Sequence, residues 1–359
     1  MKIIRFILII FFNIILLFNF EKAYCKTEKP TRTIKNLNGK SIQIPVDVRR
    51  VACFYGPSYE KVALLDAEDK IAVCSEFHKT LSPWKKKIFK RINNIPGYAS
   101  SHSPNLEELI NMKLDVVFFW DMPGVVEKIQ GIGIPVIHPA GVPGRKVEDM
   151  KYLLNVYAEV LGDKAIKIAK RYSEYFDQKI NMVKSVTSAM PDNEKPTVYF
   201  AVRKPLQTAG RDSFIPELVG LAGGISVQRD LSGGFGREIG LELLLKWNPE
   251  IIILDHCGAR WMGSAPVHEI VSQMINDKRL ESITALKNKQ VYMSPTGVFF
   301  WDSGQQVILQ IMWMAKMFHP EKFSHIDMNK ELKYFYSEFF RYKLSDDEAR
   351  RILLNLPPD

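Results

Sequence analysis

Large aromatic, arginine and histidine side chains stand at the ends of several short apolar segments of this chain. The segment-end residues are Tyr55, Trp120, Arg203, His256 and Trp301, the last preceded by Phe299 and Phe300; Arg237, Arg260 and Trp261 stand in two further loops. Aromatic rings pack against organic ligands, and the guanidinium group pairs with carboxylate or catecholate oxygens. We therefore predict that these residues bind a bulky, flat or anionic chelate.

Histidines offer a second chemistry. His78, His102, His138 and His256 all fall in predicted loops, and imidazole is a good ligand for zinc or manganese. Sequence spacing does not show whether these side chains converge. Two hypotheses stay open: direct binding of a bare metal, and a single histidine, such as His256, that completes the coordination of a chelated metal.

The motifs of several enzyme classes are absent. The chain has no G-x-S-x-G nucleophile elbow, and His268-Glu269 is followed by Ser272 where H-E-x-x-H requires its second histidine. The run Gly233-Gly234-Phe235-Gly236 lacks the lysine of a phosphate-binding P-loop. We expect neither enzyme activity nor an intrinsic cofactor; an α/β hydrolase is the alternative from another functional class.

Neither the cysteines nor the charge pattern indicates a zinc site or a nucleic-acid surface. Cys53, Cys74 and Cys257 form no C-x-x-C pair. Cys53 and Cys74 fall on consecutive predicted strands, where a disulfide and two buried free thiols are both open. The net charge of +9 is scattered, without an arginine-rich arm. We expect no nucleic-acid partner.

The first 25 residues are typical of a signal peptide. Lys2 and Arg5 precede an apolar run over residues 6–20, which is shorter than the roughly 20 residues of a membrane-spanning helix. Cleavage is expected near Ala23-Tyr24-Cys25, and Lys22 and Tyr24 fit poorly into a lipobox that would lipidate Cys25. The prediction is a periplasmic or otherwise extracytoplasmic protein, with lipidation at Cys25 as the alternative.

Periodicity divides the remaining chain into four parts. Short β-rich runs alternate with helical segments over residues 26–146 and again over residues 189–323, which predicts two Rossmann-like α/β lobes with parallel sheets. Apolar residues recur at helical spacing over residues 147–188, which predicts one long connecting helix, bent near Gly162. Residues 324–359 are expected to form an appended helical segment packed on the second lobe.

An internal repeat supports the two lobes. Residues 106–119 align without a gap to residues 241–254, and each copy contains a short helix opened by a glutamate, a turn closed by an acidic residue, and a buried strand. Two related lobes joined by a helix place a ligand cleft between them, where the strands end. A rigid helix also predicts small lobe movements on binding.

The order of several short motifs gives a specific resemblance. Val48-Arg49-Arg50-Val51, residues 104–109, Gly133-Ile134-Pro135-Val136, residues 241–254 and residues 286–292 occur in sequence. In this order they resemble the periplasmic binding proteins of iron-siderophore, haem and cobalamin ABC importers, the helix-bridged class III. The resemblance covers about residues 31 to 320.

This resemblance implies a function and partners. It implies capture of a metal chelate, with a ferric siderophore as the best match, and its delivery to a permease and its ATPase in the inner membrane. Haem, cobalamin, a nickel or cobalt chelate, a bare metal or an oxyanion stay open, as does a receptor that signals without transport. Glu107 and Glu242 match the family's permease-docking glutamates, although acids at helix starts also stabilise the helix dipole.

Overall fold

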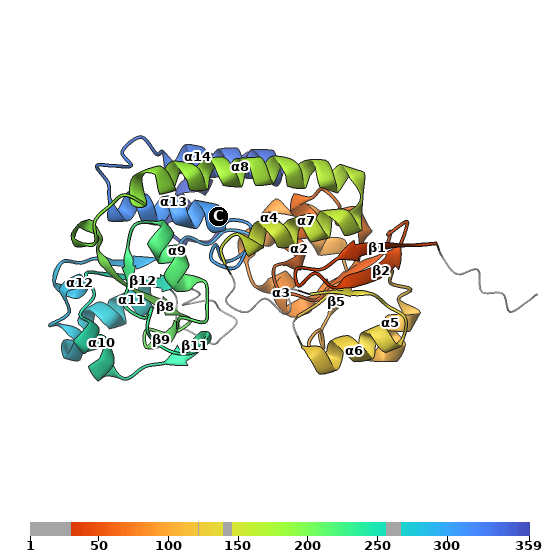
Figure 1. Ribbon diagram of the computed structural model, residues 1–359, viewed down its shortest axis with the longest axis horizontal. Helices are drawn as coiled ribbons and strands as arrows, with labels where there is room; N and C mark the ends of the chain where they lie inside the picture. The colour runs from red at the N-terminus through yellow and green to blue at the C-terminus, as the bar shows by residue number, and fades with distance from the viewer. Residues whose placement is uncertain (1–29, 121, 139–145, 256–266) are drawn as a thin grey trace, which may run out of the picture.

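The computed structural model describes residues 30–120, 122–138, 146–255 and 267–359. The predicted signal peptide, residues 1–25, lies outside the described residues, as do the predicted ligand contacts His256, Arg260 and Trp261. In the described part of the chain, no helix is both long and apolar enough to span a membrane. Figure 1 shows two α/β lobes side by side, with helix α8 (Asp163–Thr187) running across both along one edge.

The first lobe contains a five-stranded parallel sheet in the order β5-β4-β3-β6-β7. Its elements are β3 (Val51–Cys53), α2 (Ser58–Leu64), η1 (Glu68–Lys70), β4 (Ile71–Ser75), α3 (Glu76–Thr80), α4 (Pro83–Ile88), η2 (Lys90–Asn94), β5 (Gly97–Tyr98), α5 (Leu106–Asn111), β6 (Val116–Phe118), α6 (Pro123–Gly131) and β7 (Val136–Ile137). An antiparallel hairpin, β1 (Thr31–Lys35) and β2 (Ser41–Pro45), precedes them. Every residue of β3 and β6 is buried, as expected of central parallel strands covered on both faces.

The second lobe contains a mixed sheet in the order β11-β9-β8-β12-β13, with β10 also paired to β8. Its elements are η3 (Asp192–Glu194), β8 (Thr197–Val202), β9 (Gln207–Ala209), α9 (Ile215–Leu221), β10 (Ile225–Ser226), β11 (Phe235–Glu238), α10 (Leu241–Trp247), β12 (Ile251–Asp255), α11 (Val267–Asn276), η5 (Lys278–Leu280), α12 (Thr284–Lys287) and β13 (Val291–Met293). The predicted parallel pairing holds for β10, β8, β12 and β13, and β9 and β11 add antiparallel pairs at one edge. The connection from β8 to β9 is too short for the crossover that a parallel pair needs.

The segment predicted as one long helix, residues 147–188, is two helices. Helix α7 (Asp149–Leu161) ends at Gly162, and α8 begins directly after it. Gly162 has φ 103° and ψ −173°, a conformation open to glycine and costly for other residues. The chain therefore turns back, and Lys151 Nζ on α7 lies 2.5 Å from Asp177 Oδ1 on α8. Of these two helices, α8 is the one that runs across both lobes (Figure 1).

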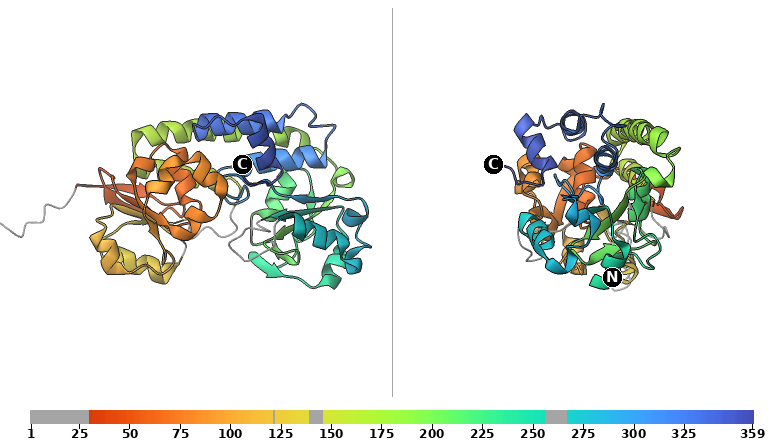
Figure 2. Two further views of the ribbon diagram at one scale, coloured as in Figure 1. Left: turned by 180° about the vertical axis from the view of Figure 1, so that it is seen from behind. Right: turned by 90° about the vertical axis from the view of Figure 1, so that its left-hand side faces the viewer.

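The C-terminal segment contacts the first lobe as well as the second, so the expectation that it packs on the second lobe is incomplete. Its helices are α14 (Met328–Phe339) and α15 (Asp346–Leu353), and they follow α13 (Val307–Phe318). Figures 1 and 2 show α14 beside α8, and Lys179 Nζ lies 2.5 Å from Glu331 Oε1 across that contact. Beyond α14, the Phe340 ring lies edge-on against Phe89 of the first lobe, with centroids 5.2 Å apart. Through this aromatic contact, just after α4, the C-terminal segment also packs on the first lobe.

The internal repeat is visible in the turns of both lobes. Lys113 and Asn248, at equivalent positions, have φ 51° and φ 42°. Asp115 Oδ2 accepts hydrogen bonds of 2.9 Å from the backbone N–H groups of Arg49 and Arg50. The equivalent Glu250 Oε2 accepts a 2.7 Å bond from the Thr197 N–H. In each lobe an acidic residue thus ties the repeat to the start of the neighbouring strand of the sheet, β3 or β8.

Candidate functional site

Four side chains meet at the carboxyl ends of the first-lobe strands. Tyr55 follows β3, Trp120 follows β6, His78 lies in α3 directly after β4, and His102 lies in the loop before α5. Since β3, β4 and β6 are adjacent parallel strands, their carboxyl ends lie at one edge of the sheet. We call Tyr55, His78, His102 and Trp120 the strand-end cluster.

Ring contacts hold the strand-end cluster together around Trp120. The Tyr55 ring meets it edge-on with centroids 4.7 Å apart, and the His102 ring stacks on it at 5.5 Å with an interplanar angle of 19°. The His78 ring lies 5.6 Å from it. Tyr55 and His78 are buried, whereas His102 is exposed. The cluster is therefore a compact, ring-lined surface with one open side at His102.

A loop of the second lobe, residues 294–301, closes on this cluster. A Cβ at Gly56 would lie 3.0 Å from His78 Nε2 and 3.2 Å from Phe299 Cζ, so the close approach of the two lobes requires a glycine there. Lys85 Nζ donates a 2.9 Å hydrogen bond to the His78 carbonyl and lies 5.0 Å from the centre of the Phe299 ring. Strand ends of both lobes therefore contribute to one region.

The buried polar groups of the cluster are suited to hydrogen bonding. Burial lowers the pKa of His78 to about 3, with Lys85 and His102 acting in the same direction, so its imidazole is neutral at pH 7. Burial also lowers the pKa of Lys85 to about 8, although Glu60 partly opposes this shift. His78 Nδ1 and Trp120 Nε1 are buried without a hydrogen-bond partner among the described residues. Buried polar atoms normally have partners, so these two indicate a place for a ligand or water.

The remaining predicted contacts within the described residues are Trp301, Arg203 and Arg237. Trp301 is fully buried in the main hydrophobic core. Arg203 and Arg237 are exposed on the second lobe; Arg203 donates its backbone N–H to the Asp255 carbonyl at 2.8 Å, and the Arg237 side chain lies against Gly233. The contact of these three residues with a ligand stays a prediction.

The metal and thiol hypotheses have different outcomes. Where the chain is described, no group of three or more histidine, cysteine, aspartate or glutamate side chains is placed to hold a metal ion. Cys53 and Cys74 pair in register between β3 and β4 and are buried free thiols. Burial raises the pKa of both thiols, which disfavours the reactive thiolate form.

Glu107 and Glu242 occupy equivalent places in the two lobes. Both are exposed in the first turn of their helices, α5 and α10, and Figure 1 shows these helices on the side of the molecule away from α8. The Asn105 side chain caps α5 by accepting from the Glu107 and Glu108 N–H groups, whereas Gly240 gives α10 no side-chain cap. Their role in permease docking stays a prediction.

Sequence analysis missed Lys85 and the buried Glu60. Lys85 lies between Pro83-Trp84 and two further lysines, a pattern typical of a solvated helix face, yet it is fully buried. Glu60 is also fully buried, and it accepts a 3.2 Å hydrogen bond from Gln306 Nε2 of the second lobe. The burial of Trp84 beside Lys85 depends on the C-terminal segment, which no local pattern connects to α4.

Comparison with known proteins gives consistent matches. A family model described as periplasmic binding protein matches residues 51–296. The molybdate-binding protein MolA of Haemophilus influenzae is 24% identical over 353 residues, 89% of this chain and 94% of MolA. A solved structure of MolA, described as the molybdate periplasmic binding protein of an ABC transporter, contains bound molybdate. It matches this chain with a TM-score of 0.74 at 21% identity, covering 88% of this chain and 99% of MolA.

Two further solved structures resemble the chain. A periplasmic solute binding protein of Veillonella parvula has a TM-score of 0.75 at 25% identity and covers 91% of this chain and 97% of its own. The Helicobacter pylori protein CeuE with bound Ni(II) has a TM-score of 0.70 at 22% identity, covering 90% and 99%. These matches confirm the two-lobed fold that the sequence predicted.

Proposed function

Because the chain belongs to the periplasmic binding protein family, we propose that it captures a compact metal-containing ligand between its lobes and delivers it to the permease and ATPase of an ABC importer. It is a transport binding protein and not an enzyme, as its family and its relatives indicate. The observation that carries the choice of ligand is the pair of buried, unpartnered nitrogens, His78 Nδ1 and Trp120 Nε1, within the described strand-end cluster.

The packing of the cluster supports a compact ligand. Tyr55 and His78 are buried against other rings, so they offer edges and polar atoms more than open stacking faces. A neutral imidazole and an indole N–H satisfy a few oxygen or nitrogen atoms, as in an oxyanion or an amino-acid chelate. The buried ammonium of Lys85 nearby adds attraction for a negative charge. MolA was solved with molybdate and CeuE with Ni(II), both small species.

Larger ligands are the competing predictions. A ferric siderophore, haem or cobalamin would need a wide lining, and the predicted residues that would widen it include Arg260 and Trp261, outside the described part of the chain. A bare divalent metal would need several converging ligands, and the described residues include no such group. Each alternative makes a distinct prediction in a binding assay.

Isothermal titration of the exported protein, purified from the periplasm of an expression host, tests the proposal. The titrants are molybdate, sulfate as the matched oxyanion, nickel with histidine, nickel alone, a ferric catecholate siderophore, haem and cobalamin. We expect saturable binding of molybdate or of nickel with histidine, and these two arms distinguish an oxyanion from a chelate. Binding of only the siderophore, haem or cobalamin would contradict a compact ligand.

A further inference from the structure

We propose that residues 324–359, here called the C-terminal strap, position the loop 294–301 against the strand-end cluster, and that Tyr336 and Asn355 set ligand affinity without touching the ligand. The family model ends at residue 296, so the strap lies beyond the matched segment. The structural half of this inference concerns the loop alone, whereas the half that concerns affinity rests on the proposed function.

The strap forms hydrogen bonds with the largely buried loop at its start and at its centre. Asn355 Nδ2 donates to the Ser294 carbonyl at 2.8 Å and lies 3.4 Å from Thr296 Oγ1. Tyr336 Oη accepts from the Val298 N–H at 3.4 Å and donates to Gln306 Oε1 at 2.7 Å. A Cβ at Gly297 would lie 1.8 Å from Tyr336 Oη, so this phenol occupies the space that any other residue would fill.

Hydrogen bonds from the second lobe reach the loop at Ser294 and Phe299. Ser294 begins it with a 2.9 Å hydrogen bond from its N–H to the Leu254 carbonyl and a contact of 2.9 Å between its hydroxyl and Gln310 Oε1. Gln306 Nε2 reaches the Phe299 carbonyl at 3.4 Å. At its centre, the Gly297 carbonyl accepts a 2.6 Å bond from Ser82 Oγ of the first lobe. The middle of the loop is therefore set by the first lobe and the strap.

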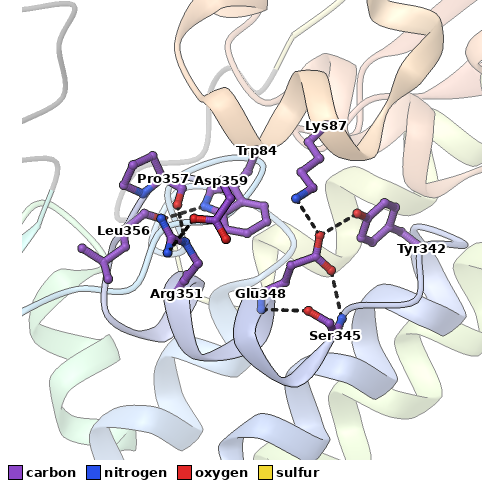
Figure 3. A network of polar contacts seen from close by, with 9 residues as sticks. All are labelled: Trp84, Lys87, Tyr342, Ser345, Glu348, Arg351, Leu356, Pro357 and Asp359. Carbon is purple, nitrogen blue, oxygen red and sulfur yellow. Dashed lines mark hydrogen bonds and ion pairs between the residues drawn. The ribbon is translucent and has the colours of Figure 1, made fainter.

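The strap is in turn anchored on the first lobe, as Figure 3 shows. Trp84 Nε1 on α4 donates a 2.9 Å hydrogen bond to the Leu356 carbonyl, and Lys87 Nζ lies 3.0 Å from Glu348 Oε1. Glu348 also completes a capping box with Ser345 at the start of α15. Arg341 donates to the carbonyls of Ala63 and Leu64 at the end of α2.

These contacts form one continuous support. The first lobe fixes the strap through α2 and α4, the strap fixes the loop through Tyr336 and Asn355, and the loop places Phe299 against His78 and Lys85. Because Trp84 and Tyr336 are at most 2% exposed, the support is packed rather than loosely surface-bound. Ligand affinity should therefore depend on residues of the strap, because a displaced Phe299 would open the cluster to water.

Hydrogen exchange measured by mass spectrometry tests the structural half. The variant is Asn355→Gly, because Asn355 has φ 55° and glycine keeps that backbone conformation while losing the amide. The control is Lys333→Ala, which removes an exposed ion pair with Asp346 in the same strap. We expect exchange of the loop amides to rise about tenfold in Asn355→Gly, and to stay unchanged in Lys333→Ala. Unchanged exchange in Asn355→Gly, with Tyr336→Phe also unchanged, would overturn the inference.

Titration with molybdate, or with nickel and histidine, tests the half that concerns affinity. In Asn355→Gly we expect a Kd weakened about fivefold with the melting temperature within a few degrees of the wild type. A faster-exchanging loop with an unchanged Kd would overturn the link to the ligand while leaving the positioning of the loop intact. Failure of the wild type to bind either probe would count against the proposed function, and the exchange data would still decide the structural half.

Discussion

In the first lobe, the repeated strand β6 leads into Trp120, whose ring lies among Tyr55, His78 and His102, whereas the equivalent strand of the second lobe, β12, ends at the buried Asp255. The turns before these strands are alike, with a left-handed residue at Lys113 and at Asn248. The two lobes therefore share the helix, turn and strand of the repeat, but they differ in the residues at the ends of those strands. Within the described residues, the ring chemistry of the site belongs chiefly to the first lobe.

The acidic residues Asp115 and Glu250, which tie each repeat to its neighbouring strand, test how similar the two turns are in stability. Asp115 is buried and accepts two backbone hydrogen bonds, whereas Glu250 is exposed and accepts from Thr197 alone. Asp115→Ala should lower the free energy of unfolding by about 3 kcal/mol, because it leaves two part-buried N–H groups without their charged partner. Glu250→Ala should lower it by about 1 kcal/mol. Urea denaturation followed by circular dichroism measures both; equal losses would mean that burial does not separate the two anchors.

The same comparison shows what sequence predicts and what it does not. Local patterns predict the repeat, the parallel direction of the first-lobe strands, and the placement of Tyr55 and Trp120 at strand ends, because a strand and its turn lie within a few residues. The reversal at Gly162 was predicted only as a bend, since helical periodicity continues across it. The contact between Trp84 and Leu356 joins residues that no local pattern links. The burial of Lys85 depends on the same contact and could not be predicted for the same reason.

Removing the Trp120 ring tests whether the difference between the two strand ends determines ligand affinity. Trp120→Ala should weaken ligand binding about 100-fold, because large aromatic side chains at the centre of a site dominate its binding energy. The matched control is Trp247→Ala, which removes a half-buried ring packed on Tyr199 in the second lobe. It should lower stability and leave the Kd within about twofold. Titration calorimetry measures both, and comparable loss of affinity in the two variants would place the ligand elsewhere.

The helix-start glutamates test whether both lobes dock alike. The double variant Glu107→Arg with Glu242→Arg should lower uptake into cells about tenfold while leaving ligand affinity unchanged, because reversed charges at a docking surface mainly impair association. A control with the same change in net charge is Glu127→Arg with Glu238→Arg, both exposed in the structure. Equal transport by the two double variants would limit Glu107 and Glu242 to stabilising the dipoles of their helices.

Two buried groups at the lobe junction should give opposite dependences of stability on pH. Burial lowers the pKa of His78 to about 3, so the unfolded chain takes up this proton first and stability is lost as pH falls below about 6.5. Burial raises the pKa of Glu60 to about 7, against the opposing effects of Lys61 and Lys85, so the folded protein holds this proton and stability is lost as pH rises from about 4.5 through 7.

The corresponding variants separate these effects. Relative to the wild type, His78→Asn should gain on the order of 1 kcal/mol between pH 7.5 and pH 5, and Glu60→Gln should gain a similar amount in the opposite direction. Urea midpoints at the two pH values measure the changes. Parallel pH profiles for both variants and the wild type would show that neither group titrates differently in the folded and unfolded chain.

Tryptophan fluorescence of the purified protein tests most directly whether the ligand binds beside Trp120. The wild type and Trp120→Phe would be titrated with the compact ligand that calorimetry identifies, under conditions where calorimetry shows both variants to be saturated. Our account predicts a saturable change in emission in the wild type that is lost in Trp120→Phe, because the reporting indole is the one at the strand ends. An equal change in both proteins would contradict it and would move the site away from the strand-end cluster.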